Sequence, residues 1–399
     1  RKRVHNSPRH VAFSDGMRGF LSALALARAA ARTRAELQGT RGRRLSHCAA
    51  APARPSFGIA FDIDGVILRG RSPIGGSPQA IRRLYSDDGT LKIPFLFLTN
   101  GGGVPEHKRA LELSELLGVN ISPAQVVHGH SPYRDLVKRF EDDLIVAVGK
   151  GEPASVMAEY GFRKVLSIDE YSSLFKEIDP LAPFKKWKVG QPNYKDFMSE
   201  KMHPPYDVYQ EKVKGVFVVS DPVDWGRDLQ VLCDILSTGG LPGNGKGDQP
   251  PLYFSADDLE YQAAFPSERL GMGAFRIALE SVFNQVNDVP LKYTSYGKPN
   301  PFVFKNAANI LEKIVMGIYP NSQPRNEVQD HQFSTIYMIG DNPKVDINGV
   351  LKAGPPWSSV LTRTGVFRGN DNDPKFPADL VVDTVDDAIS CILEKECIR

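Results

Sequence analysis

Two short apolar runs open the folded part of this chain. Ser56–Ile63 (SFGIAFDI) and Ile93–Leu98 (IPFLFL) are apolar without a polar alternation, and a helical pattern follows each, at about 77–85 and 105–117. A strand that is apolar on both sides is usually buried on both sides, as in a parallel sheet covered by helices. The pattern therefore predicts the beginning of an α/β fold.

The alternation of strands and helices restarts after about residue 125 and changes again near Tyr296. In the middle stretch we expect strands at 144–148, 216–219 and 252–254 and helices at 154–160 and 225–236. In the last stretch we expect helices at 301–314, 346–353 and 385–393 and strands at 335–339, 358–361 and 380–382. The polar segments Asp179–Pro205 and Gly243–Pro250 read as surface loops. The pattern predicts a doubly wound parallel-sheet core in two parts, 56–125 and 293–399, interrupted by an inserted α/β domain at 126–292.

Composition narrows the class of protein. The 399 residues are 41% hydrophobic and 24% charged, which is ordinary for a globular chain. No apolar run approaches the roughly 18 residues of a membrane-spanning helix, so no transmembrane segment is expected. The four cysteines are scattered without metal-binding spacing, which favours a reducing compartment and argues against a disulfide framework.

The first 55 residues differ in charge from the rest. They hold 12 Lys and Arg against two acidic residues, whereas the whole chain has a net charge of only +2, so the remainder is mildly acidic. From Met17 the segment is rich in Arg, Ala, Leu and Ser, which favours a mitochondrial presequence directed to the matrix. A disordered basic tail and an arm that binds nucleic acid are the alternatives. We favour the presequence and expect no nucleic-acid partner.

Four short motifs follow predicted strands or open the helices after them. They are FDIDGV with Asp62 and Asp64, LTNGGG with Thr99 and Asn100, YGKPNP with Lys298, and GDNPKVD with Asp341 and Asp346. Each motif alone is weak, since DxD, GKP and GDN all occur as solvated turns or helix caps. Because the carboxyl ends of parallel strands meet at one edge of a sheet, the four motifs in this order favour one common site.

The residue types limit the chemistry of such a site. Several carboxylates in one crevice repel each other unless a cation lies among them, and oxygen ligands without His or Cys suit Mg²⁺ rather than zinc. The Thr99 hydroxyl and the amides of the turn Gly101–Gly103 can form an oxyanion cradle. The Lys298 ammonium can neutralise a phosphoryl oxygen.

At these residues the chain resembles the haloacid dehalogenase superfamily of aspartate-nucleophile phosphotransferases. Only 37 residues separate Asp62 from Thr99, but 199 separate Thr99 from Lys298, so the chain is similar to the class IIA (NagD-like) members, which carry an α/β cap between these motifs. The segments Val219–Leu236 and Tyr261–Arg276 extend the resemblance to a mitochondrial group of these hydrolases. The resemblance implies a Rossmann-like core with an inserted α/β cap domain.

The resemblance also implies a role for each motif residue. Asp62 would be the nucleophile and Asp64 the general acid and base. Thr99 and the N–H of Asn100 would bind the phosphoryl group, which Lys298 would steady. Asp341 would hold Mg²⁺ together with the Asp62 side chain and the Asp64 carbonyl, and Asp346 would support these ligands from behind. Two residues depart from the pattern, because Val345 stands where class members often have Thr, and Pro343 stiffens the same loop.

These roles describe a Mg²⁺-dependent phosphatase that acts through an aspartyl-phosphate on a small phosphorylated metabolite. An acid at Asp64 favours hydrolysis of that intermediate, since the transport ATPases of the superfamily have Thr there. The alternatives are a non-catalytic or weakly catalytic binding or scaffold protein on the same fold, and a lipid-phosphate phosphatase in glycerophospholipid metabolism. A homo-oligomer formed through the cap is a further expectation.

Some polar residues of the inserted domain are candidates for substrate contacts. They are Asp221, Asp224, Trp225 and Asp257, although each is individually more typical of a loop or helix cap. The glycines at Gly271–Gly273 open a helix and allow either an anion site or close packing.

Overall fold

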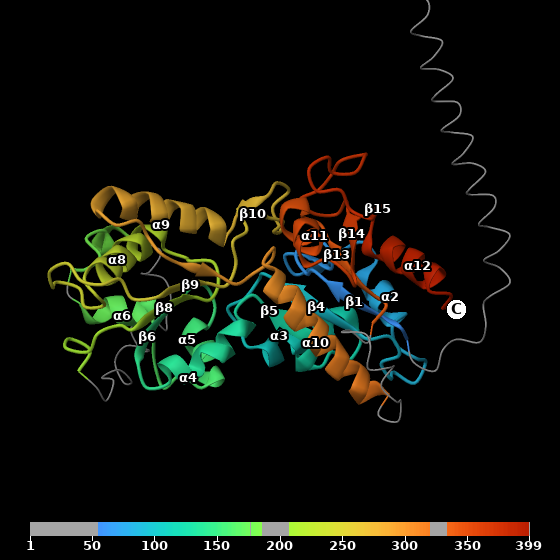
Figure 1. Cartoon of the computed structure of the whole chain (residues 1–399), viewed down its shortest axis with the longest axis horizontal. Helices are drawn as coiled ribbons and strands as arrows, with labels where there is room; N and C mark the ends of the chain where they lie inside the picture. Colours follow the sequence, from blue (N-terminus) through green and yellow to red (C-terminus); the bar gives the residue numbers. More distant parts are fainter. Residues whose placement is uncertain (1–54, 176, 186–206, 320–332, 399) are drawn as a thin grey trace, which may run out of the picture. The chain divides into compact units, whose positions relative to one another are not determined.

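The computed structural model describes residues 55–175, 177–185, 207–319 and 333–398 (Figure 1). The presequence prediction and most of the predicted loop at 179–205 lie outside these residues. Every helix and strand described below belongs to one compact unit, Arg54–Glu396. Within the described part of the chain, no helix is both long and apolar enough to cross a lipid bilayer.

A six-stranded parallel sheet forms the core, in the order β15-β14-β13-β1-β4-β5. Its strands are β1 (Phe57–Phe61), β4 (Phe95–Thr99), β5 (Val126–His128), β13 (Thr335–Gly340), β14 (Trp357–Thr362) and β15 (Leu380–Val382). The order puts β1 between β4 and β13, which are more than 200 residues apart in the chain. β1, which precedes Asp62, therefore lies directly between β4, which ends at Thr99, and β13, which precedes Asp341.

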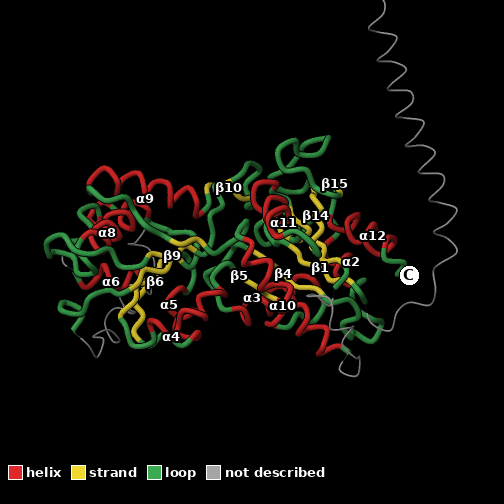
Figure 2. Tube along the Cα trace, viewed as in Figure 1, coloured by secondary structure: helices red, strands yellow, loops and turns green. Residues whose placement is uncertain are grey.

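The helices linked to this sheet cover its apolar strands (Figure 2). They are α2 (Ser77–Arg82), α3 (Glu106–Leu117), α10 (Pro301–Ile318), α11 (Asn348–Ala353) and α12 (Val385–Lys395). On α10, Phe304 and Leu311 pack against Ala60, Leu96 and Met338 of the three central strands, and all five are buried. This burial on both strand faces explains the unbroken apolar runs and confirms the predicted doubly wound α/β core.

A second parallel sheet has five strands in the order β12-β9-β8-β6-β7. Its strands are β6 (Leu144–Val148), β7 (Lys164–Ser167), β8 (Gly215–Val218), β9 (Leu252–Phe254) and β12 (Thr294–Ser295). Its helices are α4 (Val137–Phe140), α5 (Pro153–Tyr160), α6 (Ile168–Leu174), α8 (Trp225–Ser237) and α9 (Met272–Val286). Two short antiparallel pairs complete the strands, β2 (Leu68–Arg69) with β3 (Ser72–Pro73) and β10 (Glu260–Tyr261) with β11 (Arg269–Leu270).

The strand pairing differs from the expected boundaries at both junctions between the sheets. β5 lies in the expected insert but pairs with β4 of the core sheet, and β12 lies in the expected core but pairs with β9 of the second sheet. At both places the chain passes from one sheet to the other next to a glycine, Gly129 or Gly297. An added side chain at either glycine would collide with the backbone carbonyl of Ser255. The boundaries could not be read from the sequence because both crossing segments are short strands of two or three residues.

Other elements also differ from the expectation. β7 and α6 were not expected, since the strand KVLS is only partly buried and begins with a lysine, so its apolar signal is weak. The helix expected at 346–353 is α11 preceded by a single π-helical turn, Pro343–Ile347. Asn342 begins that turn, and its side chain accepts a hydrogen bond from the N–H of Lys344.

Candidate active site

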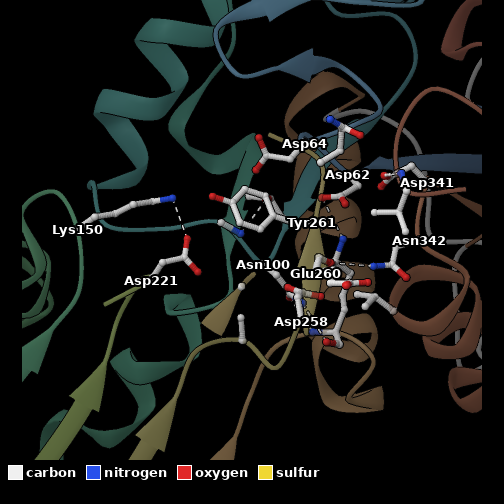
Figure 3. Close-up of a pocket in the computed structure, with 18 residues that line it drawn as sticks. Asp62, Asp64, Asn100, Lys150, Asp221, Asp258, Glu260, Tyr261, Asp341 and Asn342 are labelled. Carbon is white, nitrogen blue, oxygen red and sulfur yellow. Dashed lines mark hydrogen bonds and ion pairs between the residues drawn. The ribbon is translucent and has the colours of Figure 1, made fainter. Parts of the chain in front are cut away.

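One pocket holds six of the seven expected residues, five of them at the carboxyl ends of core strands and Lys298 in the loop after β12 of the second sheet (Figure 3). These are Asp62, Asp64, Thr99, Asn100, Lys298 and Asp341. Asp346, the seventh, is fully buried behind them. The order of the strands explains the convergence, because β13, β1 and β4 end at the same edge of the sheet.

Lys298 lies between two carboxylates. Its Nζ donates a hydrogen bond to Asp346 Oδ1 (2.7 Å) and lies 3.1 Å from Asp62 Oδ1, while its side chain is only 1% exposed. The other oxygen of Asp346 accepts a hydrogen bond from the N–H of Asn342 (3.0 Å). Burial lowers the pKa of Lys298, but the carboxylates of Asp346 and Asp62 outweigh it and raise the pKa above its ordinary value. Lys298 is therefore held as a cation.

Three carboxylates crowd together at this point. Asp62, Asp341 and Asp346 each offer an oxygen atom, and these atoms all lie within 4.8 Å of one another. Burial is the main cause that raises the pKa of Asp62 to about 7; Asp346 and Asp64 add to it and Lys298 opposes it. Burial and the neighbouring Asp62 also raise the pKa of Asp341 well above its ordinary value. The single ammonium of Lys298 thus leaves negative charge uncompensated, as a cation site requires.

Glycines make room for these carboxylates. An added side chain at Gly65 or Gly365 would collide with the carboxylate of Asp341, and one at Gly340 would collide with that of Asp346. Gly65 also has a φ of +85°, which few other residues adopt. The amide of Val366 fixes Asp341 by donating to its Oδ2 (2.7 Å). The loops after β1, β13 and β14 are therefore shaped around the acidic group.

The last residue of β4 and the turn after it form the second side of the pocket. The buried Thr99 accepts a hydrogen bond at Oγ1 from the N–H of Gly101 (3.0 Å). The Asn100 side chain binds the Lys298 backbone twice, donating to its carbonyl (2.9 Å) and accepting from its N–H (2.8 Å). Only the backbone N–H of Asn100 was expected to matter; its side chain positions the loop of Lys298.

Asp64 lies apart from the three crowded carboxylates. A side chain added at Gly101 would come within 3.4 Å of Asp64 Oδ2 and 3.1 Å of Thr99 Oγ1, so Asp64 lies beside the glycine turn. Burial raises the pKa of Asp64, against the opposing charges of Arg109 and Lys150. A carboxyl group in this environment can carry a proton to the pocket.

The second sheet contributes three polar residues that sequence reasoning missed or left uncertain. Lys150 follows β6, Asp221 follows β8 and Asp258 follows β9, and all three line the pocket (Figure 3). Lys150 Nζ donates to Asp221 Oδ2 (2.8 Å) and lies 5.5 Å from the ring centre of Tyr261. The strand-end rule that located the core residues would have found these residues too.

Asp258 has the largest pKa shift of these three residues. Burial raises its pKa to about 8, opposed by the charge of Lys298 and by a hydrogen bond with Asn100. Asp258 is therefore a further carboxyl of raised pKa at the pocket, contributed by the loop after β9.

The other candidates in the insert have structural partners. Asp224 caps α8 and accepts from Lys185 Nζ (2.6 Å), and Asp257 accepts from Arg276 Nε (2.5 Å). Trp225 packs edge-on against Phe275. The N–H groups of Gly271 and Gly273 donate to the carbonyls of Leu259 and Asp258 (2.9 and 2.8 Å), so close packing explains this glycine pair.

Comparison with known families and relatives gives matches over most of the described chain. A model described as haloacid dehalogenase-like hydrolase matches residues 59–163, and a second hydrolase-like model of the same superfamily matches residues 295–388. A mitochondrial hydrolase of Saccharomyces cerevisiae is 33% identical over 352 residues, which cover 84% of this chain and 95% of that protein. A cardiolipin synthase and mitochondrial hydrolase fusion protein of Schizosaccharomyces pombe is 35% identical, and the match covers 84% of this chain and 53% of the fusion protein.

Solved structures with lower identity share the fold. A sugar phosphatase candidate of Cytophaga hutchinsonii superposes with a TM-score of 0.56 at 14% identity, covering 83% of this chain and 94% of that one. A glycerol phosphate phosphatase of Mycobacterium tuberculosis, in complex with magnesium, superposes with a TM-score of 0.50 at 16% identity, covering 82% and 75%.

Proposed function

This chain belongs to the haloacid dehalogenase-like hydrolases, and from that premise we propose that it is a Mg²⁺-dependent phosphatase acting through an aspartyl-phosphate on a small phosphorylated metabolite. The observation that carries the proposal is the arrangement of Asp62, Lys298 and Asp341 at one pocket, with Asp64 beside the glycine turn.

In the first step a carboxylate oxygen of Asp62 attacks phosphorus. A bond forms between Asp62 and phosphorus while the bond from phosphorus to the substrate oxygen breaks, and Asp64 gives its proton to that oxygen. In the second step the Asp64 carboxylate takes a proton from a water molecule whose oxygen attacks phosphorus. The bond to Asp62 then breaks, and inorganic phosphate leaves with Asp62 restored.

The residues fit a magnesium ion. The crowded donor set consists of carboxylate oxygens only. Burial, and after it the neighbouring carboxylates, raise the pKa values of Asp62 and Asp341, and a cation bound beside them would oppose this shift. Asp62, Asp341 and the Asp64 carbonyl would hold the ion. Asp346 would act behind them, because its two oxygens already accept from Lys298 and Asn342. When bound, Mg²⁺ supplies positive charge to the phosphoryl oxygens.

Names of similar proteins support the reaction and the location. Two fold neighbours are called phosphatases, and two relatives above 30% identity are called mitochondrial hydrolases. We infer a mitochondrial protein, in line with the arginine-rich leader. A homo-oligomer through the second sheet and its helices stays a prediction.

A phosphorylated glycerolipid is a second candidate substrate. The observation that favours this second candidate is the S. pombe relative, in which the hydrolase is fused to a cardiolipin synthase. The two substrate classes share the phosphate monoester and differ in the group attached to it.

Phosphate release by the full chain tests the function. We would assay an aryl phosphate, a panel of water-soluble phosphometabolites and a phosphorylated glycerolipid in mixed micelles, each with Mg²⁺ and with EDTA. Asp62→Asn should lower turnover at least about 1,000-fold because the covalent step is lost, and EDTA should also abolish turnover. Asp288→Asn, at an exposed carboxylate paired with Lys246, is the matched control and should behave as the wild type.

The outcomes separate the alternatives. An Asp62→Asn variant as active as the wild type would contradict the mechanism. A wild-type protein without turnover on any of these substrates would instead favour the non-catalytic binding protein.

A further inference from the structure

Two buried histidines lie behind the glycine turn, outside the pocket. His128 ends β5 and His130 follows two residues later, and their rings stack with centres 4.7 Å apart at an angle of 20°. The side chains are 3% and 0% exposed. This histidine pair plays no part in the reaction steps above, so its position against the turn calls for a separate explanation.

Hydrogen bonding fixes the proton of each ring. His128 Nδ1 lies 2.8 Å from the carbonyl oxygen of Gly101, which can only accept, so Nδ1 of His128 carries the hydrogen. His130 Nδ1 lies 2.7 Å from the hydroxyl of Tyr160, which itself donates to Glu106 Oε1 (2.6 Å). The hydroxyl therefore accepts from His130, whose hydrogen is also on Nδ1. The Nε2 atoms of both rings are buried without a hydrogen-bond partner.

The pair is anchored on a buried carboxylate. Glu106, in the first turn of α3, accepts from Tyr160, from the Ser131 hydroxyl (2.8 Å) and from Arg134 (2.8 Å). The Ser131 hydroxyl in turn accepts from the N–H of His128 (2.9 Å). The rings therefore cannot shift independently of α3 and α5.

The turn that touches the pair is the one beside Thr99 and Asp64. A side chain added at Gly102 would come within 2.6 Å of His130 Cδ2 and 2.7 Å of the Val219 carbonyl. On the far side, the carbonyl of Gly103 accepts from the N–H of Glu152 (2.6 Å). Glycine peptides rotate easily, so the hydrogen bond that the Gly101 carbonyl accepts from the His128 side chain bears directly on the orientation of this peptide.

We propose that His128 is a positioning residue of this phosphatase: its Nδ1–H holds the Gly101 carbonyl away from the pocket. The role rests on the proposed function. Gly101 lines the pocket and His128 does not, so the bond directs the negative end of the peptide toward the protein interior. A rotated peptide would present that oxygen to the phosphoryl group and repel it. The trans peptide also fixes the direction of the Gly102 N–H, opposite to the carbonyl.

Two substitutions separate hydrogen bonding from packing. His128→Asn keeps an N–H donor near the position of Nδ1, whereas His128→Leu has a similar apolar bulk and no donor. We expect His128→Leu to lower kcat about 100-fold and to weaken binding of inorganic phosphate, measured by calorimetry. His128→Asn should stay within about fivefold of the wild type, because one donated hydrogen bond is what the role requires.

Several results would overturn the role. Equal losses in the Asn and Leu variants, or wild-type turnover in His128→Leu, would show that the ring acts only by packing. Nitrogen-15 NMR of the wild type gives a test that needs no variant, since a hydrogen on Nε2 of His128 would contradict the bond to Gly101. A wild-type protein without phosphatase activity would remove the proposed function and this role together, whereas an active protein indifferent to His128→Leu would remove this role alone.

Discussion

Lys298 and Asp346 form an ion pair of 2.7 Å in which neither side chain is more than 1% exposed. The two residues are 48 positions apart, and the Asp346 oxygen that does not bind Lys298 accepts from the backbone of Asn342. Pro343 and Val345 flank this contact without disturbing it, since they belong to the π-helical turn that carries Asp346 inward. This ion pair indicates a structural role for Asp346, which positions the Lys298 ammonium beside Asp62.

Removing the ammonium should destabilise the protein. Lys298→Met keeps the length of the side chain but leaves the carboxylates of Asp62 and Asp346 without their cation, and breaking a buried ion pair costs about 3–5 kcal/mol. We expect a loss of that size in the free energy of unfolding, measured with urea in EDTA at pH 7.5. Lys246→Met removes the lysine of an exposed pair and should cost less than about 1 kcal/mol. Equal effects of the two changes would contradict the buried pairing.

Lys150 should influence the choice of substrate more than the chemical step. It faces the pocket from the loop after β6, paired with Asp221 and near the ring of Tyr261. We expect Lys150→Ala to raise KM for the preferred metabolite about 10-fold, because the ammonium lines the pocket and would contact the group attached to the phosphate. On an aryl phosphate, kcat should change less than threefold, and Lys246→Ala should change neither value. A drop in kcat on every substrate alike would instead assign Lys150 to the reaction itself.

The stability of the protein should fall in mild acid through the histidine pair. Burial lowers the pKa of His128 from 6.5 to about 4, and it lowers the pKa of His130 well below its ordinary value. Below pH 6.5 the unfolded chain takes up these protons and the folded chain does not, so the free energy of unfolding decreases toward pH 4. The slope is at most about 1.4 kcal/mol per pH unit for each histidine.

Urea unfolding between pH 7.5 and 4.5 measures this effect. Carboxylates also titrate in the range, so the informative quantity is the difference between the wild type and His128→Asn, which lacks one of the two groups. We expect the wild type to lose more stability than the variant as the pH falls from 6.5. Parallel curves would show that His128 is protonated equally in both states.

Much of the core could be predicted because its signals are local. Unbroken apolar runs mark β1 and β4, and polar motifs follow the strands that end at the pocket. The parallel α/β class is confirmed, and six expected site residues line one pocket. The expected boundaries of the inserted domain assigned β5 and β12 to the wrong sheet, and β7 and α6 were not expected. Segments of only two to seven residues carry little periodic signal.

Residue types and their spacing along the chain were enough to predict the fold class, the family and the set of acidic and basic residues. Three-dimensional packing was needed to show that Asn100 binds the Lys298 backbone, that Asp258 and Lys150 line the pocket, and that His128 donates to Gly101. Each of these relationships joins segments brought together by the order of strands in two sheets. Such contacts depend on three-dimensional packing, which hydrophobic periodicity along a single strand does not encode.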